Sequence, residues 1–253
     1  MTPLLAATLI FCCVFGGALF GLALHARLPE HHLDARSKDV VTLVMGLIAT
    51  VSALVLGLLI ASAHDAFDKQ QSEVQQLSAH VIQLDRFLAH YGPEANGSRD
   101  LLRRLVAEDI TQIWPAERAK PERGVRAGGS TAADELYDKV LDLAPKTASQ
   151  RFGQTRALEL MTTMANTHQL LREQAGDSMS WPFFVVLVFW LVALFVGFGL
   201  FARPNATVVT ALCVGALTVA GAIFLILEMS RPYSGLIAIS SAPMHNALDR
   251  IGR

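Results

Sequence analysis

The chain offers few groups of side chains whose types and spacing could do chemistry. The densest one places His31 and His32 between Glu30 and Asp34, with His25 nearby. Imidazole and carboxylate groups ligate zinc, but a complete site needs about four ligands in fixed geometry, and one short loop rarely supplies them. We therefore interpret this histidine cluster as part of a solvated loop, with a metal or proton-sensing site as the alternative.

The remaining acids and thiols form no catalytic pattern. Glu108 with Asp109, and Asp134 with Glu135, are neighbours in sequence, so each pair points in different directions on a helix. The 3 cysteines lie in apolar runs without a CxxC or Cys/His spacing, which is typical of packing residues. The sequence contains no Walker A, GxGxxG, HExxH or GxSxG motif. We predict a protein that is not an enzyme and has no metal or cofactor.

The composition indicates a membrane protein. Of the 253 residues, 52% are hydrophobic and 17% are charged, and the mean hydropathy is +0.40. A soluble domain carries about 25% charged residues. The net charge of -1 gives no basic excess of the kind that nucleic-acid binding requires. We expect membrane lipid to surround the chain and no nucleic acid to bind it.

Four apolar runs are long enough to cross a bilayer, which takes about 20 residues. They cover residues 4–26, 40–63, 181–202 and 206–228, and none has a charged residue in its interior. The first run lacks the basic start and the cleavage site of a signal peptide, so we expect a retained helix. Basic residues near the span ends are almost equal in number on the two sides and do not set the orientation.

The segment between the second and third spans predicts helices and no strand. Apolar residues continue with heptad spacing after the second span, so this span should extend to residue 91 as one long helix. Further helices should follow the N-cap residues Ser98, Thr131 and Thr147, with a charged, Gly/Pro-rich loop at 116–130. The two heptad seams consist of Phe67, Val74, Val81 and Leu88, and of Gln70, Leu77, Leu84 and Tyr91.

The predicted fold is therefore all-α, an integral membrane protein with four transmembrane helices and a helical insert between helices two and three. We expect a first helix pair in 1–63, a helical extramembrane domain in 64–180 and a second helix pair in 181–228. The last segment, 229–253, predicts an amphipathic tail that lies on the membrane surface or folds back on the insert.

Small residues in the second and fourth spans predict close helix packing. Such residues at every fourth position let another backbone approach, either within one chain or between chains. We expect a packed bundle that assembles as a homo-oligomer. The ladder in the second span consists of Ala49, Ala53, Gly57 and Ala61, and the fourth span has steps from Ala211 to Gly215 and from Ala216 to Ala220.

The fourth span ends on an acid. Glu228 is followed by Arg231, Pro232 and Tyr233. A carboxylate at a span end lies near the headgroups, where a charge costs less than the roughly 2.5–3.5 kcal/mol of the helix centre. Pro232 stops the helix, and Tyr233 suits a membrane interface. We interpret Glu228 as a structural anchor bonded to Arg231, a tail amide or a basic residue of the insert, with an ion site as the alternative.

Five segments resemble one family of bacterial membrane proteins. They include LDRFLAHYGPEA and LILEMSRPYSGLI, and they cover residues 39–63, 84–95, 172–190, 198–209 and 220–243. Together they resemble the bestrophin-like family, a domain of unknown function. True bestrophins are pentameric anion channels with four membrane helices per subunit and a helical cytosolic domain. The resemblance implies a homo-oligomeric ion channel of the bacterial inner membrane, with the insert and both termini in the cytoplasm.

In that interpretation the second span lines the pore, and its mostly apolar surface gates ion flow by dewetting. The sequence has no basic residue inside a span to attract anions and no acidic run like the calcium clasp of bestrophins. The alternative is a non-conducting scaffold or sensor whose helical domain binds an unknown cytosolic protein, because uncharged spans fit that role equally well. The candidate pore-lining residues are Thr42, Gly46, Ala49, Thr50, Ala53 and Gly57.

Overall fold

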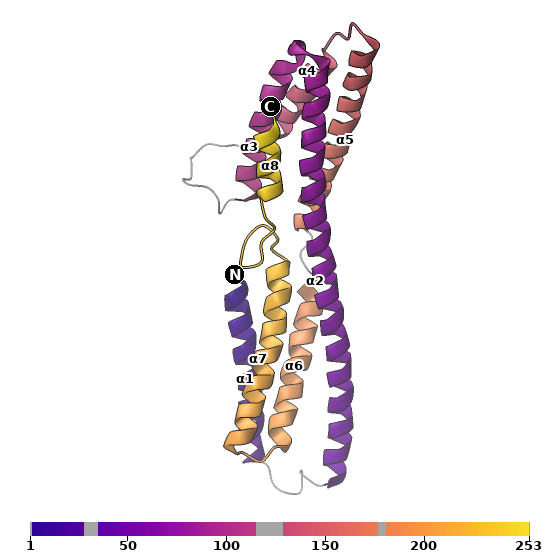
Figure 1. Ribbon diagram of the computed structural model, residues 1–253. Coiled ribbons are helices and arrows are strands. Elements are labelled where there is room, and N and C mark those ends of the chain that lie inside the picture. The colour runs from indigo at the N-terminus through magenta and orange to yellow at the C-terminus, as the bar shows by residue number, and fades with distance from the viewer. Residues whose placement is uncertain (1, 28–34, 115–128, 177–180, 253) are drawn as a thin grey trace. The chain divides into compact units, whose positions relative to one another are not determined.

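A computed structural model describes residues 2–27, 35–114, 129–176 and 181–252, and these residues contain helices and no strand. They form two compact units, shown in Figure 1. We call Met1–Phe67 with Ser178–Arg231 the membrane unit, and Asp68–Asp177 with Pro232–Arg253 the helical unit. The elements are α1 (Pro3–His25), α2 (Ala35–Tyr91), the 3-10 turn η2 (Pro93–Ala95), α3 (Asn96–Ile113), α4 (Gly129–Leu141), α5 (Ala148–Gly176), α6 (Trp181–Phe201), α7 (Ala206–Met229) and α8 (Ala242–Arg250).

Four helices are long and apolar enough to cross a membrane. They are α1, α2 from Asp39 onward, α6 from Phe184 onward and α7, with mean hydropathies of 2.3, 2.6, 2.8 and 2.4. The predictions of an all-α fold and of four spans are therefore confirmed. Helix α2 continues unbroken to Tyr91, as the heptad spacing predicts, because no Gly or Pro interrupts it after the second span.

Helices α1 and α6 approach each other backbone to backbone in the membrane unit. A Cβ atom on Gly21 would overlap the carbonyl oxygen of Val196, and one on Gly199 would overlap that of Ala18. Only glycine permits this approach, because it has no Cβ atom. Beside it, Nδ1 of His25 lies 2.8 Å from the carbonyl oxygen of Leu200. The small residues singled out in the sequence lie on α2 and α7, so sequence reasoning missed this contact.

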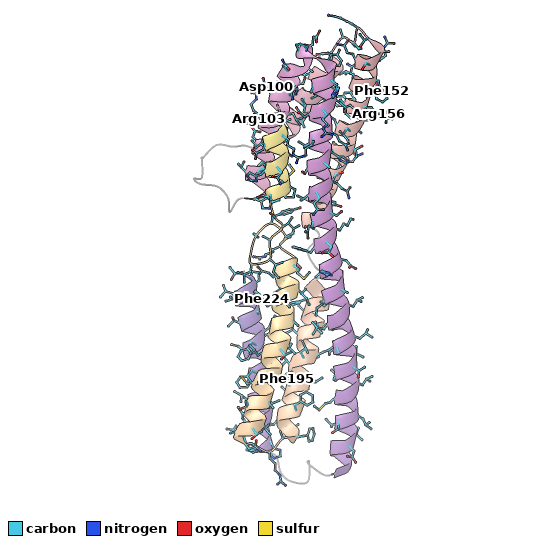
Figure 2. The ribbon with its side chains drawn as sticks, viewed as in Figure 1. Asp100, Arg103, Phe152, Arg156, Phe195 and Phe224 are labelled. Atoms are coloured by element: carbon cyan, nitrogen blue, oxygen red, sulfur yellow. The ribbon has the colours of Figure 1, made fainter. Side chains whose placement is uncertain are left out.

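The core of the membrane unit lies between α1, α6 and α7, and one side of α2 packs against it. Gly215 of α7 makes room for the ring of Phe195, whose place on α6 is labelled in Figure 2, since a Cβ there would lie 3.3 Å from that ring. Ala216 and Ala220, the other predicted step of α7, are buried. The core side chains are Ile10, Val14, Ala18, Phe184, Leu187, Leu191, Leu194, Phe195, Ala216 and Ile223.

The core of the helical unit is built on the heptad seams of α2. Every seam residue from Gln70 to Tyr91 is buried, which confirms the predicted pattern, and Phe67 is half-buried. Gln70 breaks the apolar seam: it is 8% exposed, and its Oε1 has no hydrogen-bond partner among the described residues. The facing helices contribute Leu101, Leu102, Leu105, Val106, Ile110, Leu136, Val140, Met244 and Ala247.

Two predicted helix starts were wrong by a few residues. Helix α3 begins at Asn96 after the N-cap residue Ala95, because the turn of η2 runs directly into it, and Ser98 is buried in its first turn. Helix α4 begins at Gly129, so Thr131 lies inside it. Gly and Ser fit a first turn, where backbone amides need no intrahelical partner. Of the predicted loop at 116–130, residues 129 and 130 are thus helical, and residues 116–128 lie outside the described residues.

The start of α5 matches the prediction, and its first turns tie it to α4. The Oγ1 of Thr147 accepts a hydrogen bond from the amide of Gln150 at 3.1 Å, as an N-cap residue does. One turn later, Nε2 of Gln154 lies 2.9 Å from the carbonyl oxygen of Val140 and 2.8 Å from that of Leu143. Because the last carbonyls of a helix lack intrahelical partners, this amide closes the end of α4.

The C-terminal segment folds back on the insert, one of the two arrangements expected from the sequence. Ser78 Oγ donates a hydrogen bond to the carbonyl oxygen of Pro243 at 2.8 Å, and Trp114 Nε1 donates to that of Ile239 at 2.7 Å. Helix α8 begins at Ala242, with Pro243 in its first turn, where proline is favoured. The buried side chains of this segment include Ile239, Met244, Ala247 and Ile251, whereas Ile237 is exposed.

Candidate pore-lining helix

Three stripes of side chains run along the membrane part of α2. Each residue turns the helix by about 100°, so positions three or four apart share a stripe. The first stripe packs against the core of the membrane unit. The second consists of small or hydroxyl-bearing residues, and the third of leucines. We call them the core stripe (Ile48, Ser52, Val55, Leu56, Leu59), the small stripe (Thr42, Gly46, Ala49, Thr50, Ala53, Gly57) and the leucine stripe (Leu43, Leu47, Leu54, Leu58).

The small stripe holds all the candidate pore-lining residues, and most of it is uncovered. Thr42, Gly46, Thr50, Ala53 and Gly57 are exposed. A Cβ atom added to Gly46 or Gly57 would meet no atom of the described chain within 4 Å. Thr50 Oγ1 donates a hydrogen bond to the carbonyl oxygen of Gly46 at 2.9 Å, so its hydroxyl is held against its own helix.

Ala49 stands apart from the other candidates. It is half-buried and packs against the core of the membrane unit, at the border between the small stripe and the core stripe. The rest of the predicted ladder, Ala53, Gly57 and Ala61, is exposed. Among the described residues, the ladder therefore does not serve packing within one chain beyond Ala49.

Helix α2 is the least covered of the four spans. In its most apolar 18-residue segment 6% of the residues are buried inside the chain, against 28%, 33% and 22% for the other three spans. Leu54 is 70% exposed, and Leu43 is 75% exposed. Figure 2 shows side chains projecting from α2 on the side away from α6 and α7. A broad apolar surface on this helix is thus available to lipid or to another polypeptide.

Ser52 is a polar residue of the core stripe that sequence reasoning did not single out. Its side chain is 3% exposed, and its Oγ has no hydrogen-bond partner among the described residues. The sequence offered one signal for it, a serine hydroxyl in an apolar span two residues after Thr50, which lies on a different face of the helix. A buried hydroxyl next to the small stripe lowers the apolar character of the interface between α2 and the core.

The structure places Glu228 in the last turn of α7, where the sequence puts the end of the span. The residue is 3% exposed. The backbone amide of Arg231 donates a hydrogen bond to the carbonyl oxygen of Glu228 at 3.0 Å and closes the helix end. Pro232 follows, and its carbonyl oxygen accepts from the amide of Ile239 at 2.7 Å. The anchor role of the Glu228 side chain stays a prediction.

Tyr233 lies against Trp114 in the helical unit. The two rings meet edge to face, with centroids 5.6 Å apart and an interplanar angle of 87°. Burial, and secondly the negative charge of Glu73, raise the pKa of Tyr233 to about 12. Glu73 is itself buried, and its Oε2 has no hydrogen-bond partner among the described residues. A role of Tyr233 at the membrane interface, expected from the sequence, stays a prediction.

The histidine cluster falls mostly on residues that the structure does not describe. His31, His32, Glu30 and Asp34 lie outside the described residues. His25, which is described, contacts the carbonyl oxygen of Leu200 as noted above. Among the described residues, no three or more His, Cys, Asp or Glu side chains are grouped as metal ligands.

These features define an all-helical membrane protein with four candidate spans and a separate helical unit. The chain belongs to the bestrophin-like family: the Bestrophin-like domain matches residues 12–244. The fold is also similar to the crystal structure of a bacterial bestrophin homologue from Klebsiella pneumoniae that carries a point mutation. The TM-score is 0.62 at 12% sequence identity, over 97% of this chain and 99% of that chain. No curated protein matches the chain.

Proposed function

We propose that this protein is a homo-oligomeric ion channel in which the small stripe of α2, repeated in each copy, surrounds the pore. The observation that carries the proposal is that the least covered span has its glycine, alanine and threonine residues on an uncovered side. Membership of the bestrophin-like family supports it, because the family resemblance implies a channel with this layout.

The contrast between the two uncovered stripes favours the small stripe as the pore lining. Leucine side chains are as apolar as lipid tails and fill the space around a helix, so the leucine stripe suits lipid or a neighbouring copy. Glycine and alanine leave a wider path between adjacent helices, and the hydroxyls of Thr42 and Thr50 add polar groups along it. A lining of this kind holds back ions chiefly through the cost of removing their water.

The proposal includes a location. We place the protein in the bacterial inner membrane, with the helical unit and both termini in the cytoplasm, as the family resemblance implies. Charges at the span ends do not decide this orientation. Trypsin added to sealed, right-side-out vesicles should therefore leave the arginine-rich and lysine-rich helical unit uncut, and cleavage within residues 68–177 would reverse the assignment.

Ion flux measured on purified protein in liposomes tests the channel. Tryptophan at Ala53 or Gly57 should block most of the flux, because a large indole ring from every copy would fill the pore. Leu54→Trp is the matched control: it adds the same ring on the same helix turn, but on the leucine stripe, and should leave the flux within about twofold. The same assay, run once with a chloride gradient and once with a sodium gradient, measures whether the channel prefers anions or cations.

Two conduction results would overturn the proposal. One is well-folded protein that conducts no ion under any gradient, and it would favour a non-conducting scaffold whose helical unit binds a cytosolic protein. The other is flux that Leu54→Trp abolishes and that Ala53→Trp leaves intact, which would move the pore to the leucine stripe. A native mass measurement that finds only monomer in lipid nanodiscs would also contradict a pore built from several copies.

A further inference from the structure

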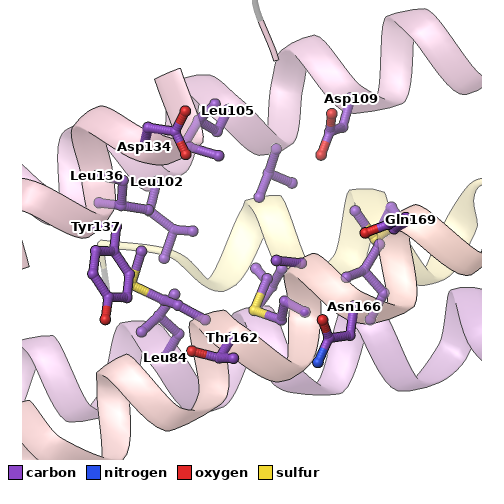
Figure 3. A pocket seen from close by; sticks show the side chains of 18 residues that line it. Leu84, Leu102, Leu105, Asp109, Asp134, Leu136, Tyr137, Thr162, Asn166 and Gln169 are labelled. Atoms are coloured by element: carbon purple, nitrogen blue, oxygen red, sulfur yellow. The ribbon is translucent and has the colours of Figure 1, made fainter. Parts of the chain in front are cut away.

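A cavity of about 520 Å³ opens within the helical unit, between α2, α3, α4, α5 and α8 (Figure 3). Its volume lies in the range of about 300–1,000 Å³ that small-molecule sites occupy. The floor consists of buried aliphatic side chains from four helices, among them Val81, Leu102, Leu136 and Met244. Because these residues are also core residues, the packed core forms the floor and gives it a defined shape.

Polar groups gather at the rim of this cavity and not at its floor. Figure 3 shows Asp109 and Asp134 on one wall, with Thr162 and Asn166 on the other. Asp134, Thr162 and Asn166 are exposed, in contrast to the floor. Tyr137 adds an aromatic ring on the α4 side. The cavity therefore combines an apolar interior with a hydrogen-bonding mouth, which is the usual make-up of a ligand site.

The described lining residues carry two carboxylates, those of Asp109 and Asp134, and no Lys, Arg or His. The nearest basic group on α4, Lys139, forms an ion pair with Glu135 at 2.9 Å and is not part of the lining. An anionic headgroup would be repelled by the exposed carboxylate of Asp134, whereas a cation would be attracted by it and could also stack on the ring of Tyr137.

Two features suit the walls to a ligand. Met161, Met164 and Met244 contribute flexible thioether chains, which adapt to apolar ligands of different shapes. The walls also come from different helices, since α3 and α4 carry Asp109 and Asp134 on one side of the opening and α5 carries Thr162 and Asn166 on the other. From the volume, the apolar floor and the exposed carboxylate of Asp134 at the rim, we propose that this cavity binds an amphipathic amine, with its apolar body on the floor and its cationic group at Asp134. The proposal does not depend on ion conduction.

Three probes with one apolar body test the headgroup: 2-naphthylmethylamine, the neutral 2-naphthylmethanol and the anionic 2-naphthoate. Each would be titrated at pH 7 into the full-length protein in nanodiscs by calorimetry, with empty nanodiscs as the blank. The amine should bind more tightly than the alcohol, and the carboxylate should bind most weakly. Asp134→Asn should weaken the amine by about two- to fivefold, the range of an exposed ion pair, and leave the alcohol unchanged.

Two variants complete the experiment. Asp138→Asn removes an exposed acid of α4 outside the lining, and it should not change the affinity for the amine. Ala165→Trp places a large ring at an exposed lining position and should reduce binding of amine and alcohol alike by tenfold or more, without unfolding the protein. Equal affinities for amine, alcohol and carboxylate would overturn the assignment of the headgroup. Folded protein that binds none of the probes above the nanodisc blank, or binding that Ala165→Trp leaves unchanged, would overturn the site.

Discussion

Single residues without side chains decide how the membrane unit packs. Gly21 and Gly199 sit where the backbones of α1 and α6 meet, and each faces a carbonyl oxygen of the other helix. Gly16, five residues earlier on α1, has no atom of the described chain within 4 Å of the position that a Cβ would take. The same residue type therefore has different roles on one helix, because Gly21 faces another backbone and Gly16 does not.

Gly21→Ala should destabilise the membrane unit by about 1–3 kcal/mol, since the added methyl group forces α1 and α6 apart. Gly16→Ala is the matched control, and it should be neutral or slightly stabilising because alanine favours a helix by about 1 kcal/mol over glycine. Thermal unfolding of both variants in the same detergent measures the difference. Equal midpoints for the two variants would show that the backbone contact contributes little.

Tyr233 predicts a loss of stability at alkaline pH. A phenol in an unfolded chain has a pKa of about 10, and the folded protein raises that of Tyr233 to about 12. Below pH 10 both the folded and the unfolded chain hold the phenol proton, so Tyr233 makes its full contribution to stability. Between the two pKa values, about 10 and about 12, the unfolded chain releases the proton while the folded chain retains it, so stability falls as the pH rises.

Tyr233→Phe should remove this part of the pH dependence. The wild-type protein should lose about 1–2 kcal/mol relative to the variant between pH 9 and 12, a figure reduced because the ring is only partly buried. Burial and the charge of Glu94 also raise the pKa of Tyr91, but this residue is present in both proteins and cancels. Parallel stability curves for the two proteins over this range would contradict the assignment.

At the scale of elements, α4 depends on α5 for its end. Gln154 brings one amide group to the last carbonyl oxygens of α4, including that of Leu141 at 3.1 Å. Gln154→Ala should leave these carbonyls without a protein partner and let the last turn of α4 open more often. Hydrogen exchange in peptides that cover residues 136–145 should then be about tenfold faster, a change of about 1.4 kcal/mol in opening free energy.

The control for that experiment lies on the opposite side of α5. Arg156→Ala removes a guanidinium group that lies 5.5 Å from the centroid of the Phe152 ring and pairs with Glu159. Phe152 and Glu159 are exposed, and Figure 2 labels Phe152 and Arg156. Exchange in α4 should not respond to it. If both variants accelerated hydrogen exchange equally, α4 and α5 would be opening together as one unit, and not only the end of α4.

At the scale of the whole molecule, the helical unit is assembled from two separate parts of the sequence. Asp68–Asp177 forms most of it, and Pro232–Arg253 returns to complete it after the last span. The returning segment covers the core with Met244 and Ile251, and it satisfies the polar groups of Ser78 and Trp114. Its last turn also brings the amide of Gly252 to the buried Asp85 at 3.5 Å.

A chain that ends at Arg231 should therefore have a less stable helical unit, although all four spans remain. Limited trypsin digestion in nanodiscs should cut within residues 68–177 at least about tenfold faster, because the truncation exposes apolar core and leaves polar partners unsatisfied. Removal of Arg253 alone is the control and should have no effect. An unchanged cleavage rate after truncation would mean that the returning segment only rests on a unit that is complete without it.

The sequence by itself determined the class, the spans and the long second helix. Hydropathy sets the spans because transfer into a bilayer depends on the local run of residues, and the heptad seams of α2 predict their own burial. The family resemblance also came from local segments. A Gly-x-x-x-Gly spacing at Gly17 and Gly21 was a signal for the contact between α1 and α6, but it does not say which helix approaches.

Only the tertiary structure decided which faces are covered. The whole membrane part of α2 is free of charged residues from Val40 to Ala63, so which of the core, small and leucine stripes is covered depends on contacts with distant helices. The fold-back of the C-terminal segment and the acidic rim of the cavity likewise join residues far apart in the sequence, such as Trp114 with Ile239. Local patterns set secondary structure and burial in the bilayer, whereas these contacts arise from long-range packing that no local pattern specifies.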